Sequence, residues 1–483
     1  MKTNTLDFDA QALREKILDL AMRGKLVPQD PNDEPASVLL EKIKAEKEQL
    51  IKDKKIKKSK PLAPITDDER PFDIPDSWEW VRLGDVNTYN SESVHPDRTP
   101  DKTFELYSVP IFPTRKPEII KGEEIRSNKQ AVETGDVLLC KINPRINRVW
   151  KVSNFTDNEN IASTEWIVVR QREITTEYLR YSLMAPYFRN LLQSNVSGVG
   201  GSLTRAKPRE VRNYVLPIPP LSEQSRIAAK IAQLFALLRK VESSTQQYAQ
   251  LQTLLKSKVL DLAMRGKLVE QDPHDEPASV LLEKIKAEKE LLVKEGKIKK
   301  SKPLPPIADD EKPFDIPDSW EWVRLGDVLD VRDGTHDTPK YVSEGIALVT
   351  AKNLKDGKID FSNIRYISEK DAQKINQRSN VETDDILFAM IGTIGNPVLI
   401  TKRNNFAIKN VALLKHAKYV NMDFVCKYIL ASESFLLEYA NGGNQKFISL
   451  NKIKKLGFPL PPLVEQQNIV SKINNIFTLL TSI

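Results

Sequence analysis

Residues 221–266 read LSEQSRIAAKIAQLFALLRKVESSTQQYAQLQTLLKSKVLDLAMRG. Apolar side chains recur here at alternating intervals of four and three residues, which is the pattern of a long helix that packs against another helix, as in a coiled coil. The seam comprises Ile227, Ile231, Leu234, Leu238, Val241, Thr245, Tyr248, Gln252, Leu255, Val259 and Leu262. Ser222 can cap the start of this helix, and Gly266 suits the left-handed position that ends one. The stretch therefore predicts a helix roughly 65 Å long, which is a spacer as well as a packing element.

The chain is a tandem duplication. Residues 16–86 and 258–328 align without a gap at an offset of 242 and differ at 10 of 71 positions, and residues 216–238 match residues 458–480 at the same offset. Because 483 residues are almost twice 242, the chain is two copies of one unit, cut open inside the long helix. The counterpart of that helix is then split between the two termini. We expect its pieces to lie antiparallel along the intact helix, which predicts a pseudo-two-fold, circularly organised molecule.

The predicted fold class is α+β, with two α+β domains joined by long antiparallel helices. The expected boundaries are an N-terminal helical region at 1–71, a first α+β domain at 72–220, a central helical spacer at 221–313, a second α+β domain at 314–462 and a C-terminal helix at 463–483. Within the domains, helices are expected at 177–193 and 423–439, and strands at SWEWVRLGDV, DVLLCKI and DILFAMIGTIG.

The basic charge is concentrated in the two segments where the copies differ most, residues 87–215 and 329–457, which we call the variable segments. They carry net charges of +4 and +5, whereas the whole chain carries +7. A basic excess confined to two matching segments suits contact with a polyanion, although ordinary surface charge is an alternative. No apolar run approaches the length of a membrane span and no signal peptide is recognisable, so we expect a cytoplasmic protein without membrane contact.

The variable segments share a loop scaffold with different polar residues. The stretch GDVLLCKINPRIN (135–147) parallels DDILFAMIGTIGN (384–396), and in both copies a glycine pair precedes a polar loop and the Pro-rich exit to a helix. Glycines let a partner approach the backbone closely, and the basic and amide side chains that follow can donate to phosphates and base edges. A flexible surface loop is the alternative reading of each copy taken alone.

A catalytic reading finds little support in the sequence. There is no phosphate loop of the GxxxxGK[ST] type and no FxGxG cofactor loop, and NPRI differs from the motif with which adenine methyltransferases hold a flipped base. Cys140 and Cys426 lack a paired framework and are expected to be buried free thiols. His95 and His336 are isolated, so no metal site and no catalytic residue is predicted.

With KLVPQDPNDEPASVLLEKIKAEKE, IPDSWEWVRLGDV, GDVLL or DDILF, and PLPPLVEQQNIVSKI in place, the chain resembles the DNA specificity subunit of type I restriction-modification enzymes over essentially its whole length. The resemblance implies a non-catalytic subunit whose two target recognition domains each read one half of a bipartite, asymmetric site in double-stranded DNA. It further implies partners: two modification subunits that methylate adenine, and restriction subunits that translocate and cut DNA. S-adenosylmethionine, ATP and magnesium are then expected on those partners and no cofactor on this chain.

Candidate DNA-binding residues follow from side-chain type and loop position. In the first domain they are Arg98, Lys102, Arg115, Lys141, Arg145, Arg148, Gly200, Gly201, Arg205 and Lys207, and in the second Thr335, His336, Thr338, Lys340, Lys352, Asn353, Thr393, Lys409, Gly442, Gly443, Asn444, Gln445 and Lys446.

Two other hypotheses compete with that of a non-catalytic, sequence-reading subunit. A chain with its own nuclease or methyltransferase would modify DNA alone, and a purely structural coiled-coil adaptor would show no sequence-dependent DNA binding.

Overall fold

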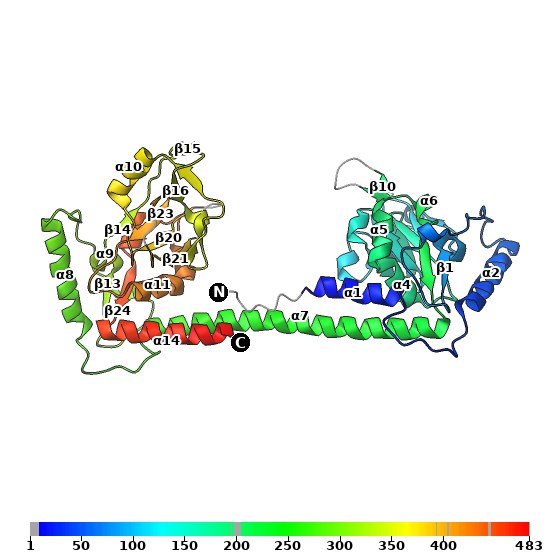
Figure 1. Cartoon of the computed structure of the whole chain (residues 1–483), viewed down its shortest axis with the longest axis horizontal. Helices are drawn as coiled ribbons and strands as arrows, with labels where there is room; N and C mark the ends of the chain where they lie inside the picture. Colours follow the sequence, from blue (N-terminus) through cyan, green and yellow to red (C-terminus); the bar gives the residue numbers. More distant parts are fainter. Residues whose placement is uncertain are drawn as a thin grey trace. The chain divides into compact units, whose positions relative to one another are not determined.

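A computed structural model describes residues 9–194, 196–197, 204–392, 394–402, 405–442 and 446–482. The chain divides into two compact units, which we call the first unit (residues 7–245) and the second unit (residues 246–483). Each unit contains one mixed domain of helices and strands, which confirms the α+β class. One helix, α7 (Leu221–Met264), begins in the first unit and ends in the second (Figure 1). The pseudo-two-fold relation between the two copies stays a prediction.

The ends of α7 are set by the residues that flank it. The helix begins directly after Pro220, whose carbonyl accepts the backbone N–H of Gln224 at 2.9 Å. Ser222 lies in the first turn and donates its hydroxyl to Asp33 at 2.5 Å, so its expected role as the cap is wrong. The end is as expected: Gly266 has a φ of +65°, and a Cβ there would lie 2.4 Å from Pro317. Only glycine fits this turn.

Each half of α7 carries one of the terminal helices. In the second unit, Gln252 donates its side-chain amide to the carbonyl of Leu480 in α14 (Leu463–Ser482), and Lys256 lies over the ring of Phe477. Rising numbers on α7 meet falling numbers on α14, so the two helices run antiparallel. In the first unit, α1 (Ala10–Met22) packs on the same core cluster as the start of α7, and Arg14 forms an ion pair with Glu242. The predicted antiparallel partners are confirmed within each unit.

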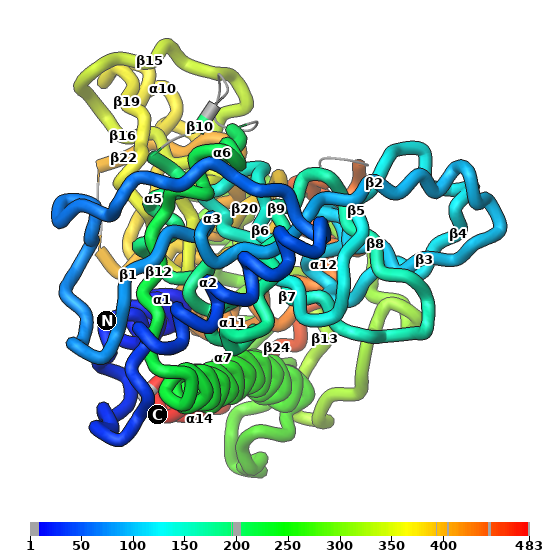
Figure 2. The backbone as a smooth tube through the Cα atoms, turned by 90° about the vertical axis from the view of Figure 1, so that its right-hand side faces the viewer, coloured from blue at the N-terminus to red at the C-terminus, as the bar shows by residue number. Residues whose placement is uncertain are grey.

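The first recognition domain contains three main sheets, besides a short two-stranded pair described below. Their strands are β1 (Glu79–Arg82) with β12 (Val215–Ile218); β7 (Val149–Lys151), β6 (Val137–Cys140) and β9 (Trp166–Val169); and β2 (Ser93–Val94), β5 (Lys129–Ala131), β8 (Glu159–Ser163), β3 (Thr103–Tyr107) and β4 (Glu118–Lys121). The five strands of the last sheet lie together at the right of Figure 2. The helices of the domain are α3 (Leu83–Val86), α4 (Thr176–Met184), α5 (Pro186–Ser194) and α6 (Pro208–Val211), and α2 (Ala36–Lys52) precedes it in the N-terminal region.

The second recognition domain repeats this plan. Its sheets are β13 (Glu321–Arg324) with β24 (Gly457–Leu460); β14 (Val331–Asp333), β23 (Val411–Leu414), β20 (Ile386–Ala389) and β21 (Gly395–Leu399); and β15 (Tyr341–Val342), β19 (Arg365–Ile367), β16 (Ile346–Val349) and β22 (Phe406–Ile408). A small pair joins β17 (Leu354–Lys355) to β18 (Lys358–Ile359). The helices of the domain are α9 (Leu325–Val328), α10 (Glu369–Ser379), α11 (Met422–Ala431), α12 (Glu433–Tyr439) and α13 (Leu450–Lys454), and α8 (Ala278–Lys294) precedes it.

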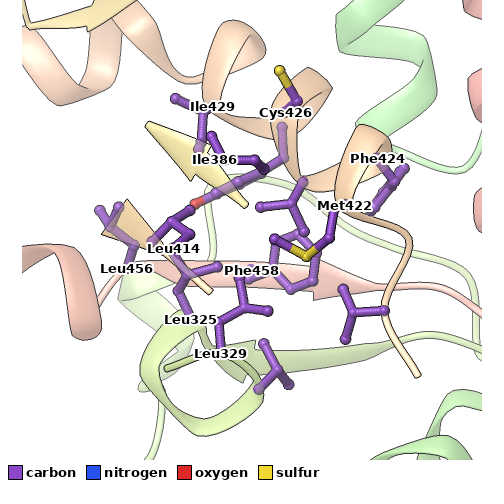
Figure 3. Close-up of a cluster of buried hydrophobic side chains, with 14 of the residues drawn as sticks. Leu325, Leu329, Ile386, Leu414, Met422, Phe424, Cys426, Ile429, Leu456 and Phe458 are labelled. Carbon is purple, nitrogen blue, oxygen red and sulfur yellow. The ribbon is translucent and has the colours of Figure 1, made fainter. Parts of the chain in front are cut away.

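The apolar motif shared by the variable segments forms a strand that is buried on both faces. In β20, Ile386 and Phe388 join the core formed with α9, α11 and β24, whereas Leu387 and Ala389 join the core on the opposite face. Figure 3 shows the first of these cores, with Leu325, Leu329, Ile386, Leu414, Met422, Phe424, Cys426, Ile429, Leu456 and Phe458. Because successive side chains of a strand point to opposite faces, a strand inside two cores is apolar throughout. Strand β6 divides its residues in the same way.

The duplicated segments make the same framework contacts in both units. Trp78 donates its indole N–H to the buried carboxylate of Glu223 at 2.9 Å, and Trp320 donates to Glu465 at 2.8 Å. A glutamine side chain binds the other oxygen of each carboxylate, Gln29 at 2.6 Å and Gln271 at 2.5 Å. Burial raises the pKa of both glutamates. The motif PIPPLSEQ (217–224), or PLPPLVEQ (459–466), therefore ties the helix that follows each domain, α7 or α14, to the tryptophan that precedes its first strand, β1 or β13.

A second framework contact is an arginine clamp, defined here as Arg82 with Glu69 and Arg324 with Glu311. Arg324 is 5% exposed and donates to both oxygens of Glu311, at 3.0 and 2.7 Å. It also donates to three backbone carbonyls, those of Pro305, Pro306 and Lys455. Arg82 makes the corresponding contacts in the first unit. The clamp joins the Pro-rich linker, the first strand and the end of each domain.

The clamp predicts a pH dependence of stability. The hydrogen bonds from Arg82 and Arg324 lower the pKa of Glu69 and Glu311 from 4.5 to about 2. A carboxyl with a lowered pKa in the folded state contributes stability above its unfolded pKa, and this contribution is lost as the pH falls toward 2. We expect the double variant Glu69→Gln, Glu311→Gln to lose less stability than the unchanged chain between pH 4.5 and 2. Denaturant unfolding across this range measures the difference, and equal slopes for the two proteins would contradict it.

Candidate nucleic-acid interface

Each recognition domain presents a loop that is hydrogen-bonded to a hairpin. In the first domain the loop after β6 meets a hairpin of β10 (Val196–Ser197) and β11 (Arg205–Ala206), with Asn143 N–H donating to Thr204 O and Ala206 N–H to Lys141 O, both at 2.9 Å. These bonds place Arg205 opposite Ile142 and hold the loop against the hairpin. In the second domain the loop after β20 meets Lys446 and Phe447 in the same way, with Gly392 N–H donating to Lys446 O at 3.0 Å and Ile391 paired with Phe447. The parallel between the two loops that the sequence predicts is therefore a shared structure.

Some of the predicted cations of the first domain are engaged within the protein. Lys102 pairs with Glu159, Arg205 with Glu165 at 3.1 Å, and Arg148 donates to a backbone carbonyl at 3.3 Å. Arg115 lies 4.0 Å from the ring centre of Phe112, where burial and the neighbouring Arg180 lower its pKa. Three others, Arg98, Arg145 and Lys207, are exposed, and no side-chain hydrogen bond or ion pair is found for them among the described residues. These three are the cations best placed to bind phosphate.

In the second domain, several predicted residues stabilise the loop that carries them. Asn353 is 7% exposed, and its amide binds Thr350 and the carbonyl of Asp360. His336 contacts Asp333 at 2.8 Å and Asn410 at 3.0 Å through its two ring nitrogens. Lys409 donates to the hydroxyl of Thr338, and Thr335 pairs with Lys409 through the backbone. Lys340 is exposed. Gly200, Gly201, Thr393, Gly443, Asn444 and Gln445 lie outside the described residues, whereas Gly442 is described, with a φ of +102°.

Predicted and unpredicted residues meet in one groove of the second domain. The groove has a volume of about 620 Å³ and lies beside the loop after β20. It is lined by Tyr341, Leu348, Thr350, Ala351, Lys352, Asn353, Asn363, Arg365, Ile391, Gly392, Lys409 and Asn410. Three of these residues are basic and none is acidic, which favours an anionic ligand. Sequence reasoning missed Arg365, Tyr341 and Asn363, although basic and aromatic residues alternate in KYV and RYI.

Two other clusters of chemically active groups serve the structure. Glu382, Asp385 and His416 bring potential metal ligands within 4.8 Å of one another, but the ammonium of Lys415 lies 2.6 Å from Glu382 and 2.7 Å from Asp385. In the first domain Arg170 binds the buried Asp136 at 2.7 Å in the corresponding place. In both ion pairs the buried aspartate, Asp136 or Asp385, directly precedes the buried strand of its domain, β6 or β20. Cys140 and Cys426 are buried free thiols, as expected, and burial raises the pKa of each.

None of the described helices combines the length and the apolar character that crossing a membrane would require.

Comparison with known proteins identifies the family. The family model of the type I restriction modification DNA specificity domain matches residues 75–252 and 317–483. The chain is 32% identical to the Escherichia coli type I restriction enzyme EcoEI specificity subunit and 34% identical to the EcoAI specificity subunit from the same species, and each comparison covers 97% of this chain and 89% of the relative.

Solved structures share the fold. The HsdS subunit from Thermoanaerobacter tengcongensis aligns with a TM-score of 0.52 and 21% identity, covering 85% of this chain and 92% of that one. A chain from a structure on complex assembly and conformational transition of the type I R-M system aligns with a TM-score of 0.61 and 22% identity, covering 85% and 93%. The chain thus belongs to the type I restriction-modification DNA specificity family and is a non-catalytic DNA specificity subunit with two target recognition domains.

Proposed function

We propose that each recognition domain reads one half of a bipartite, asymmetric site in double-stranded DNA. The observation that carries this proposal is that an identical framework holds two domains with different loops. The tryptophan–glutamate contact and the arginine clamp recur in both units, whereas the loops after β6 and β20 differ in their polar residues. Contacts to base edges specify a sequence, and contacts to phosphates only position the protein. Two domains with different loops therefore read two different sequences.

A domain exchange tests this proposal. Residues 87–215 are replaced with the corresponding segment of another specificity subunit, and the chain is produced together with its modification subunits. Methylated adenines are then mapped across the genome of the host. We expect one half of the methylated sequence to change and the other half to stay the same. Exchange of residues 329–457 is the matched control and should change only the opposite half. Unchanged methylation after both exchanges would contradict sequence reading by these domains.

The partners proposed for this chain are two modification subunits, one for each copy, together with restriction subunits that translocate and cut DNA. Their proposed docking surface is an apolar stripe on the part of α7 that belongs to the second unit, formed by Tyr248, Leu251, Leu254 and Leu255, all of which are exposed. Leu251 and Leu254 are 57% and 65% exposed, which is unusual for neighbouring leucines on one helix. A subunit that covers this stripe would remove it from water.

The proposed cofactors belong to the partners. S-adenosylmethionine serves methylation on the modification subunits, and ATP and magnesium serve translocation and cleavage on the restriction subunits. The sequence of this chain has none of the phosphate-loop or methyltransferase motifs that would hold these groups. We propose the cytoplasm, where the DNA lies, as the site of action.

A further inference from the structure

Arg365 lines the groove of the second domain, and an aromatic ring orients its guanidinium. It is the first residue of β19, and its guanidinium carbon lies 4.6 Å from the ring centre of Tyr341 in β15. Both strands belong to the same four-stranded sheet. A guanidinium stacked on an aromatic ring keeps its N–H donors at the edge of the stack, where they can form two parallel hydrogen bonds. The ring therefore orients Arg365 without using its donors.

The N–H donors of the Arg365 guanidinium bind no acceptor in the described part of the chain. Its side chain is exposed and makes no hydrogen bond or ion pair with any described residue. The carboxylate of Asp360, in the loop before β19, is already bound by Lys355 at 2.7 Å and by the hydroxyl of Ser362 at 2.6 Å. Lys352 and Lys409 line the same groove and add positive charge. An anionic ligand would thus be drawn to a groove in which Arg365 has free, oriented donors.

The corresponding position of the first domain has the opposite charge. Arg365 pairs with Leu348 of β16, and β16 runs parallel to β22. In the first domain Glu118 pairs with Leu106 of β3, and β3 runs parallel to β8. Leu106 and Leu348 are both buried, and each is the last residue but one of its strand. A surface that binds the same partner in both copies would keep the same charge, so a change from glutamate to arginine points to a contact that differs between the half-sites.

We propose that Arg365 reads a guanine in the half-site recognised by the second domain, through paired hydrogen bonds to its O6 and N7 atoms. Arginine is the residue that most often binds guanine in the major groove by such a pair. The inference rests on the proposed function and names one residue of its readout. Tyr341 acts as a positioning residue, since it holds the guanidinium plane.

The experiment uses the full chain in complex with its modification subunits and maps methylated adenines in a host genome. The variants are Arg365→Ala, Arg365→Gln and Tyr341→Ala, with Lys358→Ala as the control. Lys358 is an exposed cation of the same domain that does not line the groove. Thermal unfolding of each variant verifies that the second unit stays folded.

We expect Arg365→Ala to relax the preference for guanine at one position of one half-site by roughly 5- to 150-fold, the discrimination of one paired contact. Arg365→Gln should shift that preference toward adenine, because a glutamine amide matches the adenine edge. Tyr341→Ala, which removes the ring that orients the guanidinium, should weaken the same preference, whereas Lys358→Ala should leave it unchanged. An equal loss at all sites with every base preference kept would overturn the proposal, since it identifies a phosphate contact; unchanged methylation would overturn it as well. If the domain exchange alters a half-site and the Arg365 variants do not, only this inference fails.

Discussion

Replacing Arg324 with alanine is expected to destabilise the second unit by about 1–3 kcal/mol, the cost of leaving hydrogen-bonding groups without their partner. Arg324 is 5% exposed, and its loss leaves three backbone carbonyls without their donor. The exposed side of Glu311 recovers water, so most of the loss comes from the carbonyls. Denaturant unfolding of the purified chain measures the change in the free energy of unfolding.

Arg82→Ala is the matched control for this prediction. It removes the same contacts from the first unit and leaves the second intact. Each variant should therefore affect the reading of a different half-site when methylation is mapped at a temperature close to its unfolding midpoint. A loss below about 1 kcal/mol for both variants, the median of a surface salt bridge, would show that the clamp contributes no more than a surface ion pair.

The double variant Leu251→Glu, Leu254→Glu is expected to abolish assembly with the modification subunits. Fully burying a leucine side chain contributes about 1.5–3 kcal/mol, and a carboxylate placed in an apolar interface adds a desolvation cost. Together these terms predict at least a 100-fold weaker complex. Both leucines are exposed in the isolated chain, so its own stability should hardly change. Co-purification of the modification subunit and the dissociation constant of the complex measure the effect.

Gln246→Glu is the control for the leucine variant. Gln246 is exposed on the same helix, and at about 100° per residue it is turned by roughly 140° from Leu251 and roughly 80° from Leu254. It adds a negative charge without touching the apolar stripe. If both variants weaken the complex equally, charge on the helix rather than the stripe explains the loss. Full assembly of the leucine variant would place the docking surface elsewhere.

The parts of the fold that depend on periodicity could be predicted from the sequence. The spacing of apolar residues in 221–266 predicts the long helix, and the offset of 242 predicts which helices pair with it. Local chemistry altered the details. The helix expected at 177–193 is two helices, α4 and α5, because Pro186 cannot continue the first. The strand expected through Val86 ends at Arg82, where LGDV forms a helical turn.

The candidate interface was less predictable, because contacts between segments distant in sequence decide which side chains are available. Lys102 and Arg365 are both basic residues of variable segments, yet Lys102 forms an ion pair with Glu159 and Arg365 stacks on Tyr341 with its donors free. Asn353 has a side chain suited to a base edge but uses it inside its own loop. Side-chain type alone does not distinguish these cases. The pairing of strands and the course of the loops do.

The strand pairs that close each recognition domain bear on the order of folding. β1 pairs with β12 and β13 with β24, so Arg82 lies opposite Val215 and Arg324 opposite Gly457, although a whole domain separates them in the chain. Pairing distant strands first would require closing a long loop before any of its contacts could compensate for the lost entropy. We expect the sheets inside each domain to form early and these closing pairs late. The framework that joins the domains to α7 is then completed only on a chain whose recognition domains have already folded.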